Sequence, residues 1–313
     1  MKAAPEMPSI ADVSLMYGES FRILEENVRH TVAVVDEQTV VEVPTHQEVA
    51  VQDQFKLHAL HLLSERADQQ PPLAIPQHAA LQSDIPHLTY DYIPGHTTVD
   101  EEVCKLPEAT QQAIGRGMAE FVLWFGGTLD AGVFREELLP LKKEYLWDTR
   151  LVEILTSFDF SAYPSLTQHA NKLGAALQSQ YPNGIHGVNQ VIHDNLNAQN
   201  LVLDKDNKPA GVIGMSYITL GDAAREGRQF CRFSTTVMDA YIEETEKRTG
   251  NAISTDKVRM WTTTGFTLAL CRRVIMNRDF DSHWFDNGRK HMHDWYPNED
   301  WSELDRALKN YET

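Results

Sequence analysis

The sequence of 313 residues has few cysteines, no long apolar run and no excess of basic residues. Its three cysteines lie far apart and match no zinc spacing, which favours reduced thiols in a cytoplasm. No stretch approaches the roughly 20 apolar residues of a membrane helix, and the first residues form no apolar signal core, so we expect neither membrane insertion nor secretion. The formal net charge of −17 argues against nucleic acid and anionic membranes as partners. It would favour a cationic ligand or basic peptide, or it simply keeps the surface acidic for solubility.

The turn residues and the spacing of apolar residues predict a β-rich first third followed by helices. Residues 20–44 read as β-structure with a hairpin turn at Asp36-Glu37-Gln38, and Pro94-Gly95 breaks the chain after a further strand at 88–93. Apolar residues at helical spacing predict helices at 47–66, 106–125, 165–180, 230–249 and 255–276, with a last one near 303–311. We therefore expect an α+β protein with a small lobe over 1–93 and a mainly helical lobe over 94–313.

The most specific segment is 191–226, which reads VIHDNLNAQNLVLDKDNKPAGVIGMSYITLGDAARE. Its His193, Leu196 and Asn200 fall on the pattern H-G-D-L-H-x-x-N, and a β-hairpin follows it. Gly221-Asp222 and Glu226 then match the ending G-D-P-x-x-D. In these motifs and in its order of elements the chain resembles the aminoglycoside phosphotransferase and choline kinase group of the protein-kinase-like fold, and the hinge Tyr90 to Gly95, with Tyr92 and Ile93, is of that type.

The resemblance implies an active site from which the catalytic carboxylates are missing. The family's catalytic aspartate, which accepts the proton of the attacking hydroxyl, is Asn195 here, and the aspartate that holds magnesium is Gly214. An amide accepts no proton at neutral pH, and magnesium sites beside a nucleotide rest on carboxylates and phosphates. Asn200 alone makes a weak ligand. Asp194 stands where the family has glycine, and it is the candidate for a substitute base.

Other positions of the resemblance point the same way. His193 is expected to support the loop from below, and Asp222 to brace it rather than react. The family's basic strand residue corresponds to Glu42, with its helix partner near Gln54, or at Asp53 if the register slips. Glu25 and Glu26 fall on the turn that covers phosphates. With no lysine expected in reach, these carboxylates would repel a triphosphate.

The sequence therefore predicts a pseudokinase that binds a small molecule, peptide or partner protein without ATP-dependent phosphoryl transfer. We expect no metal site, and we expect ATP and magnesium binding to be lost. The alternative is an enzyme that uses the same cleft, either as an unusual phosphotransferase or for a different reaction in a natural-product or resistance pathway. Loss of the ATP chemistry does not exclude it, because fold alone does not fix a reaction. The sequence leaves open whether Met215 and Tyr217 fill the cleft.

Overall fold

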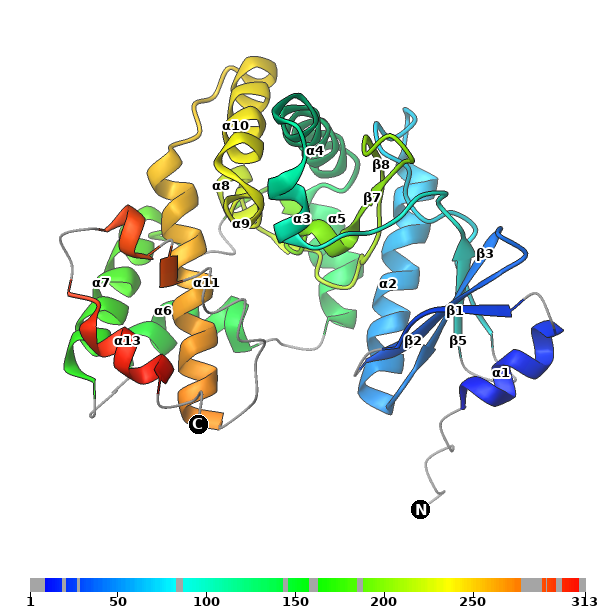
Figure 1. Ribbon diagram of the computed structural model, residues 1–313, viewed down its shortest axis with the longest axis horizontal. Helices are drawn as coiled ribbons and strands as arrows, with labels where there is room; N and C mark the ends of the chain where they lie inside the picture. Colours follow the sequence, from blue (N-terminus) through cyan, green and yellow to red (C-terminus); the bar gives the residue numbers. More distant parts are fainter. Residues whose placement is uncertain are drawn as a thin grey trace.

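The computed structural model describes residues 9–18, 21–26, 29–82, 87–142, 146–157, 163–184, 188–276, 289–290, 292–296 and 300–309. The aromatic tail residues Phe280, Trp284 and Phe285 lie outside them. The chain forms two lobes (Figure 1). The small lobe contains the five-stranded sheet with α1 and α2, and the large lobe contains the remaining helices. This confirms the predicted α+β, two-lobed fold.

The small lobe is built on a sheet with the strand order β1-β2-β3-β5-β4, paired antiparallel throughout. Its elements in chain order are α1 (Ile10–Tyr17), β1 (Phe21–Glu26), β2 (His30–Val35), β3 (Thr39–Pro44), α2 (Gln47–Arg66), β4 (Ala80–Gln82) and β5 (His87–Asp91). The predicted three-residue turn joins β2 to β3. Asp36 and Glu37 have positive φ, and Gln38 N donates to Val35 O at 3.0 Å, as at the two central residues of a type I′ turn.

The two lobes meet at the hairpin formed by β7 (Leu201–Leu203) and β8 (Pro209–Val212). These strands follow the short β6 (Val191–Ile192) and the 3-10 turn η5 (Ala198–Asn200), and β9 (Thr219–Leu220) pairs with β6. Backbone bonds tie this hairpin to the small lobe and to the segment after the hinge. Ala74 N donates to Ala210 O at 3.0 Å, and His96 N donates to Leu203 O at 2.9 Å.

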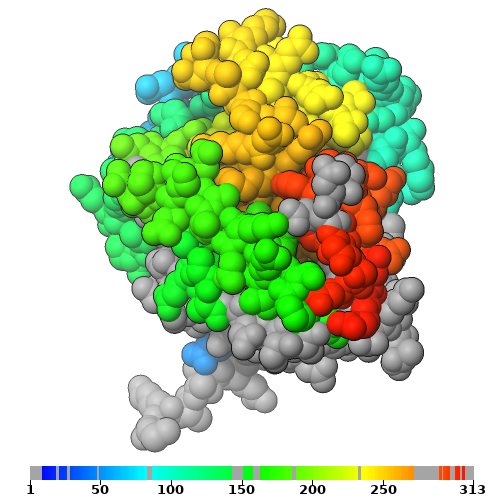
Figure 2. All heavy atoms as spheres, turned by 90° about the vertical axis from the view of Figure 1, so that its left-hand side faces the viewer, coloured from blue at the N-terminus to red at the C-terminus, as the bar shows by residue number. Residues whose placement is uncertain are grey.

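Helices make up the rest of the large lobe. They are α3 (Asp100–Lys105), α4 (Glu108–Thr128), α5 (Ala131–Val133), α6 (Leu146–Ser157), α7 (Pro164–Gln180), α8 (Ala223–Gly227), α9 (Phe230–Phe233), α10 (Thr235–Thr249), α11 (Thr255–Met276) and α13 (Ser302–Lys309), with the π-helical turn η2 (Phe134–Leu138) and the 3-10 turn η3 (Leu139–Leu141) after α5. On the face shown in Figure 2, α7 (green), α11 (orange) and α13 (red) lie together, and α7 contacts both of the others.

The predicted helix 230–249 is interrupted at Ser234. That residue is extended, and its hydroxyl accepts from Val237 N at 3.1 Å, so it ends α9 and caps α10. Sequence periodicity does not show this break because the apolar positions continue through it. No helix of the described residues is both long and apolar enough to cross a membrane.

Helix α4 packs closely on α10 through Gly115. A Cβ atom at Gly115 would lie 2.3 Å from Val237 O and 2.8 Å from the Cβ of Ala240, so only glycine allows this approach. On the same helix, a Cβ at the exposed Gly127 would meet nothing within 4 Å.

Gly115→Ala is therefore expected to lower the free energy of unfolding by about 1–3 kcal/mol, the usual cost of overpacking. Gly127→Ala, the control on the same helix, should leave stability unchanged or raise it by up to about 1 kcal/mol, because alanine favours helix. Urea unfolding of both variants and the parent measures the difference. Equal stabilities of the two variants would contradict the close packing.

Candidate functional site: the cleft between the lobes

An open cavity of about 440 Å³ lies between the small-lobe sheet and the β7–β8 hairpin. It is lined by Arg22, Leu24, Val32, Val40, Tyr90, Tyr92, Ile93, Gly95, His96, Thr97, Val202 and Ile213. The predicted hinge residues Tyr92 and Ile93 thus form part of its wall. Most of the lining is apolar, so the cavity suits a compact apolar or aromatic group.

A buried ion pair lies behind Tyr90. Lys56 Nζ donates to both carboxylate oxygens of Glu42 at 2.7 Å, and the Tyr90 hydroxyl donates to one of them. Glu42 and Lys56 are 8% and 2% exposed. Burial raises the pKa of Glu42, but the charges of Lys56 and His30 and the hydrogen bonds outweigh it, so the pKa lies below its usual value. Glu42 is thus held charged against the ammonium group of Lys56.

This pair corrects two sequence predictions. Gln54 is exposed and is not the helix partner of Glu42; Lys56 is. Asp53, the alternative position, is buried, and a carboxylate oxygen of it lies within 4.8 Å of one of Glu42. Gln54 and Lys56 are two positions apart, which corresponds to about 200° around a helix. Their side chains therefore lie on nearly opposite faces of α2. The expectation that no lysine lies near this position is also wrong. The strand and helix carry an ion pair, with the acid on the strand and the base on the helix, the reverse of the family's arrangement.

His193 is buried at the start of the loop. It is 1% exposed, lies edge-on to Phe121 and Phe125, and one ring nitrogen is 3.0 Å from Ile213 O. Burial lowers its pKa to about 4, so the imidazole is neutral at pH 7.

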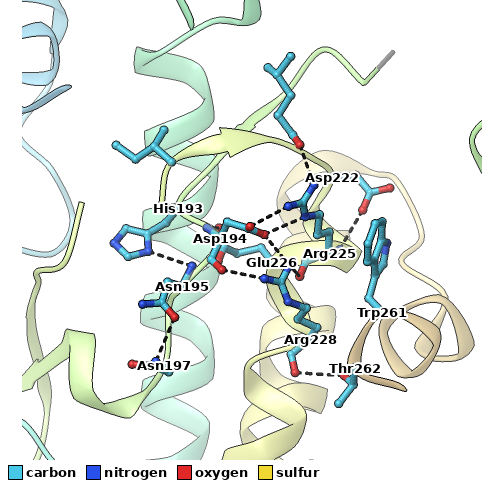
Figure 3. Close-up of polar contacts among 12 residues, drawn as sticks. His193, Asp194, Asn195, Asn197, Asp222, Arg225, Glu226, Arg228, Trp261 and Thr262 are labelled. Carbon is cyan, nitrogen blue, oxygen red and sulfur yellow. Dashed lines mark hydrogen bonds and ion pairs between the residues drawn. The ribbon is translucent and has the colours of Figure 1, made fainter. Parts of the chain in front are cut away.

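Asp194 is held by two arginines (Figure 3). Arg225 binds it through Nε and Nη2 at 2.8 and 2.7 Å, and Arg228 Nη1 donates to the same carboxylate. Asp194 also has φ +64, a conformation that favours the glycine found there in the family. Bidentate arginine pairs are strong, and these bonds take up the oxygens that a substitute base would need.

Asn195 and Asn200 belong to a network of three asparagines within the loop. Asn200 Nδ2 donates to Asn195 O at 2.7 Å, Asn197 Nδ2 donates to Asn195 Oδ1 at 3.1 Å, and Asn197 Oδ1 accepts from Asn200 N at 3.1 Å. The amides therefore stabilise the turn that holds them.

The position expected for a metal carboxylate is closed. Gly214 has φ +78, and a Cβ atom there would lie 2.1 Å from Asn200 Oδ1. The Asn200 amide thus occupies the space into which a side chain at position 214 would project.

Asp222 lies behind the loop and begins α8. Its Oδ1 accepts from Arg225 N at 2.9 Å, and its Oδ2 accepts from the Tyr181 hydroxyl at 2.7 Å. Lys257 on α11 forms an ion pair with the same Oδ2 at 2.6 Å. Asp222 therefore connects the start of α8 to Tyr181 and Lys257, and its bracing of the loop stays a prediction.

Arg29 and Tyr217 connect the two lobes. Arg29, which precedes β2, donates to the Tyr217 hydroxyl and lies 5.4 Å from the centre of its ring. Met215 is fully buried in the core, so it does not project into the open cavity. Tyr217 is held by Arg29 at the lobe boundary.

Sequence reasoning missed Lys56, Arg225 and Arg228. The two arginines stand on either side of Glu226, within six residues of the motif Gly221-Asp222. The aspartate at 194, where the family has glycine, is a signal that a cation is needed nearby. Lys56 carries no such signal, because its role depends on the rotation of α2 against the sheet.

Gly214→Asp tests whether the metal position is closed. We expect it to lower the free energy of unfolding by about 1–3 kcal/mol more than Gly250→Asp does, because of overpacking against Asn200. Gly250 has φ +70 and open space around it, so this control carries similar backbone strain without the clash. Urea unfolding gives both values. Asn200→Ala combined with Gly214→Asp should recover part of the loss, and equal costs for the two glycine variants would contradict the closure.

Glu226 gives a pH-dependent prediction. Burial and the charge of Asp194 raise its pKa from 4.5 to about 7. The folded chain therefore binds more protons than the unfolded chain between these values, so this carboxyl makes the free energy of unfolding fall as pH rises through that window. Glu226→Gln cannot titrate, and its stability relative to the parent should rise from pH 4.5 to 7. Urea unfolding across this range is the measurement, and parallel curves would contradict the shift.

Comparisons with known proteins identify the fold. No protein-family model and no curated protein sequence matches the chain. Among solved structures, the GDP and kanamycin complex of APH(2")-IIia has a TM-score of 0.69 at 15% identity, covering 92% of this chain and 98% of that one. ADP-bound aminoglycoside phosphotransferase APH(2'')-Ib has a TM-score of 0.61 at 16% identity, covering 90% and 95%.

A macrolide phosphotransferase is similar as well. The apoenzyme of macrolide 2'-phosphotransferase MphH from Brachybacterium faecium has a TM-score of 0.52 at 14% identity, covering 92% of this chain and 97% of that one. At these identities the likeness concerns the fold. The chain has the protein-kinase-like fold of the aminoglycoside and macrolide phosphotransferases.

Proposed function

We propose that this protein is a pseudokinase, which binds a ligand in the cleft between its lobes without ATP-dependent phosphoryl transfer. The observation that carries the proposal is the closed metal position, where the Asn200 amide occupies the space next to Gly214. Phosphoryl transfer depends on metal ions that neutralise the charge of the phosphates. The residues at this position do not fit magnesium, since they supply no carboxylate there.

The remaining groups support the same proposal. Asn195 accepts no proton at neutral pH, and Asp194 is bound by Arg225 and Arg228. Lys56 lies beside the position of the family's phosphate-binding base, and both oxygens of Glu42 accept from it. None of these side chains is placed to do what its counterpart does in a kinase.

The cavity supports binding as the retained activity. Its apolar wall at the hinge can enclose a compact group of a small molecule or a side chain of a peptide or protein. The net charge of −17 favours a cationic partner. We also propose a cytoplasmic location, which is supported by the free thiols of Cys104 and Cys231.

The test is phosphoryl transfer from radiolabelled ATP with magnesium, measured as hydrolysis and as transfer to a panel of hydroxyl compounds. We expect no turnover above background for the parent or for Asn195→Asp, because groups that act as a unit are not restored singly. Adding Gly214→Asp and Glu42→Lys should not restore it either, since the first meets Asn200 and the second faces Lys56.

An active phosphotransferase of the same fold, assayed in parallel, is the positive control. Turnover by the parent protein that Asp194→Ala abolishes would contradict the proposal and support an enzyme with a displaced base. Circular dichroism of each variant shows whether the absence of phosphoryl transfer reflects unfolding.

A further inference from the structure

Three residues of the small lobe bring metal-binding atoms together. His30 on β2, Glu42 on β3 and Asp53 on α2 each offer one such atom, and these atoms lie within 4.8 Å of one another. A ring nitrogen of His30 is 2.9 Å from Asp53 Oδ1. The three residues are distant in sequence, and the antiparallel pairing of β2 with β3 and the packing of α2 create the cluster.

One atom of this cluster has no partner. Asp53 is fully buried, and its Oδ2 has no hydrogen-bond partner within the described part of the chain. A buried carboxylate oxygen without a partner costs free energy. This cost points to a group that the oxygen can bind.

We propose that His30, Glu42 and Asp53 bind a divalent transition-metal ion, with Zn²⁺ as the ion that fits best. One imidazole and two carboxylates are common zinc ligands, and three protein ligands leave a position for water. An imidazole disfavours Mg²⁺ and Ca²⁺, which select oxygen. The site is separate from the hinge cavity, because none of its three ligands lines that cavity.

Lys56 competes with the metal ion. Its ammonium group holds Glu42 at 2.7 Å, so an ion that binds Glu42 must displace it. The site is therefore weakened by a cation of the protein itself. Replacing Lys56 with methionine removes the competitor and leaves the three ligands in place.

The experiment is equilibrium dialysis and calorimetry with Zn²⁺ on the full chain. We expect one ion per chain at this site, bound at least about tenfold more weakly by His30→Ala and by Asp53→Asn, and at least about tenfold more tightly by Lys56→Met. His78→Ala is the control, because His78 pairs with Asp91 at 2.7 Å on the surface, outside the cluster. This variant should bind Zn²⁺ as the parent does.

Circular dichroism shows that each variant is folded. If Lys56→Met does not fold, the parent compared with Asp53→Asn and His78→Ala still decides. No binding by the parent, or equal binding by the parent, Asp53→Asn and His30→Ala, would overturn the proposal.

Discussion

The buried ion pair of Glu42 and Lys56 joins the sheet to α2, and the small lobe depends on it. Removing one partner of a buried pair leaves an uncompensated charge and typically costs about 3–5 kcal/mol. Here Tyr90 also donates to Glu42, so the pair links strand, helix and cavity wall. Neither residue lines the cavity, and both carboxylate oxygens of Glu42 accept from Lys56, so the pair is a structural link within the small lobe.

The loop from His193 to Asn200 is stabilised by contacts of its own side chains. Asp194 binds two arginines, and Asn195 and Asn200 bond within the turn. A buried polar network in which every group has a partner is rigid. Breaking it would leave buried polar groups unpaired, which costs much free energy in a low-dielectric environment. The side chains of Asp194, Asn195 and Asn200 thus hold the loop itself.

Much of the fold is predictable because local patterns agree with it. The hairpin turn at Asp36, the helix α2 and the helix α11 follow from turn residues and apolar spacing. The absence of a carboxylate at positions 195 and 214 is visible in the sequence. The pairing of Lys56 with Glu42 is not, because it depends on how α2 is rotated against the sheet. The space that Asn200 takes beside Gly214 likewise depends on backbone torsions that no spacing rule gives.

The most direct test of this account is the effect of magnesium on nucleotide affinity, measured by calorimetry with ATP and with adenosine. A site without metal carboxylates predicts that magnesium does not strengthen ATP binding and that the phosphates add no affinity over adenosine. Micromolar ATP affinity that depends on magnesium would contradict it.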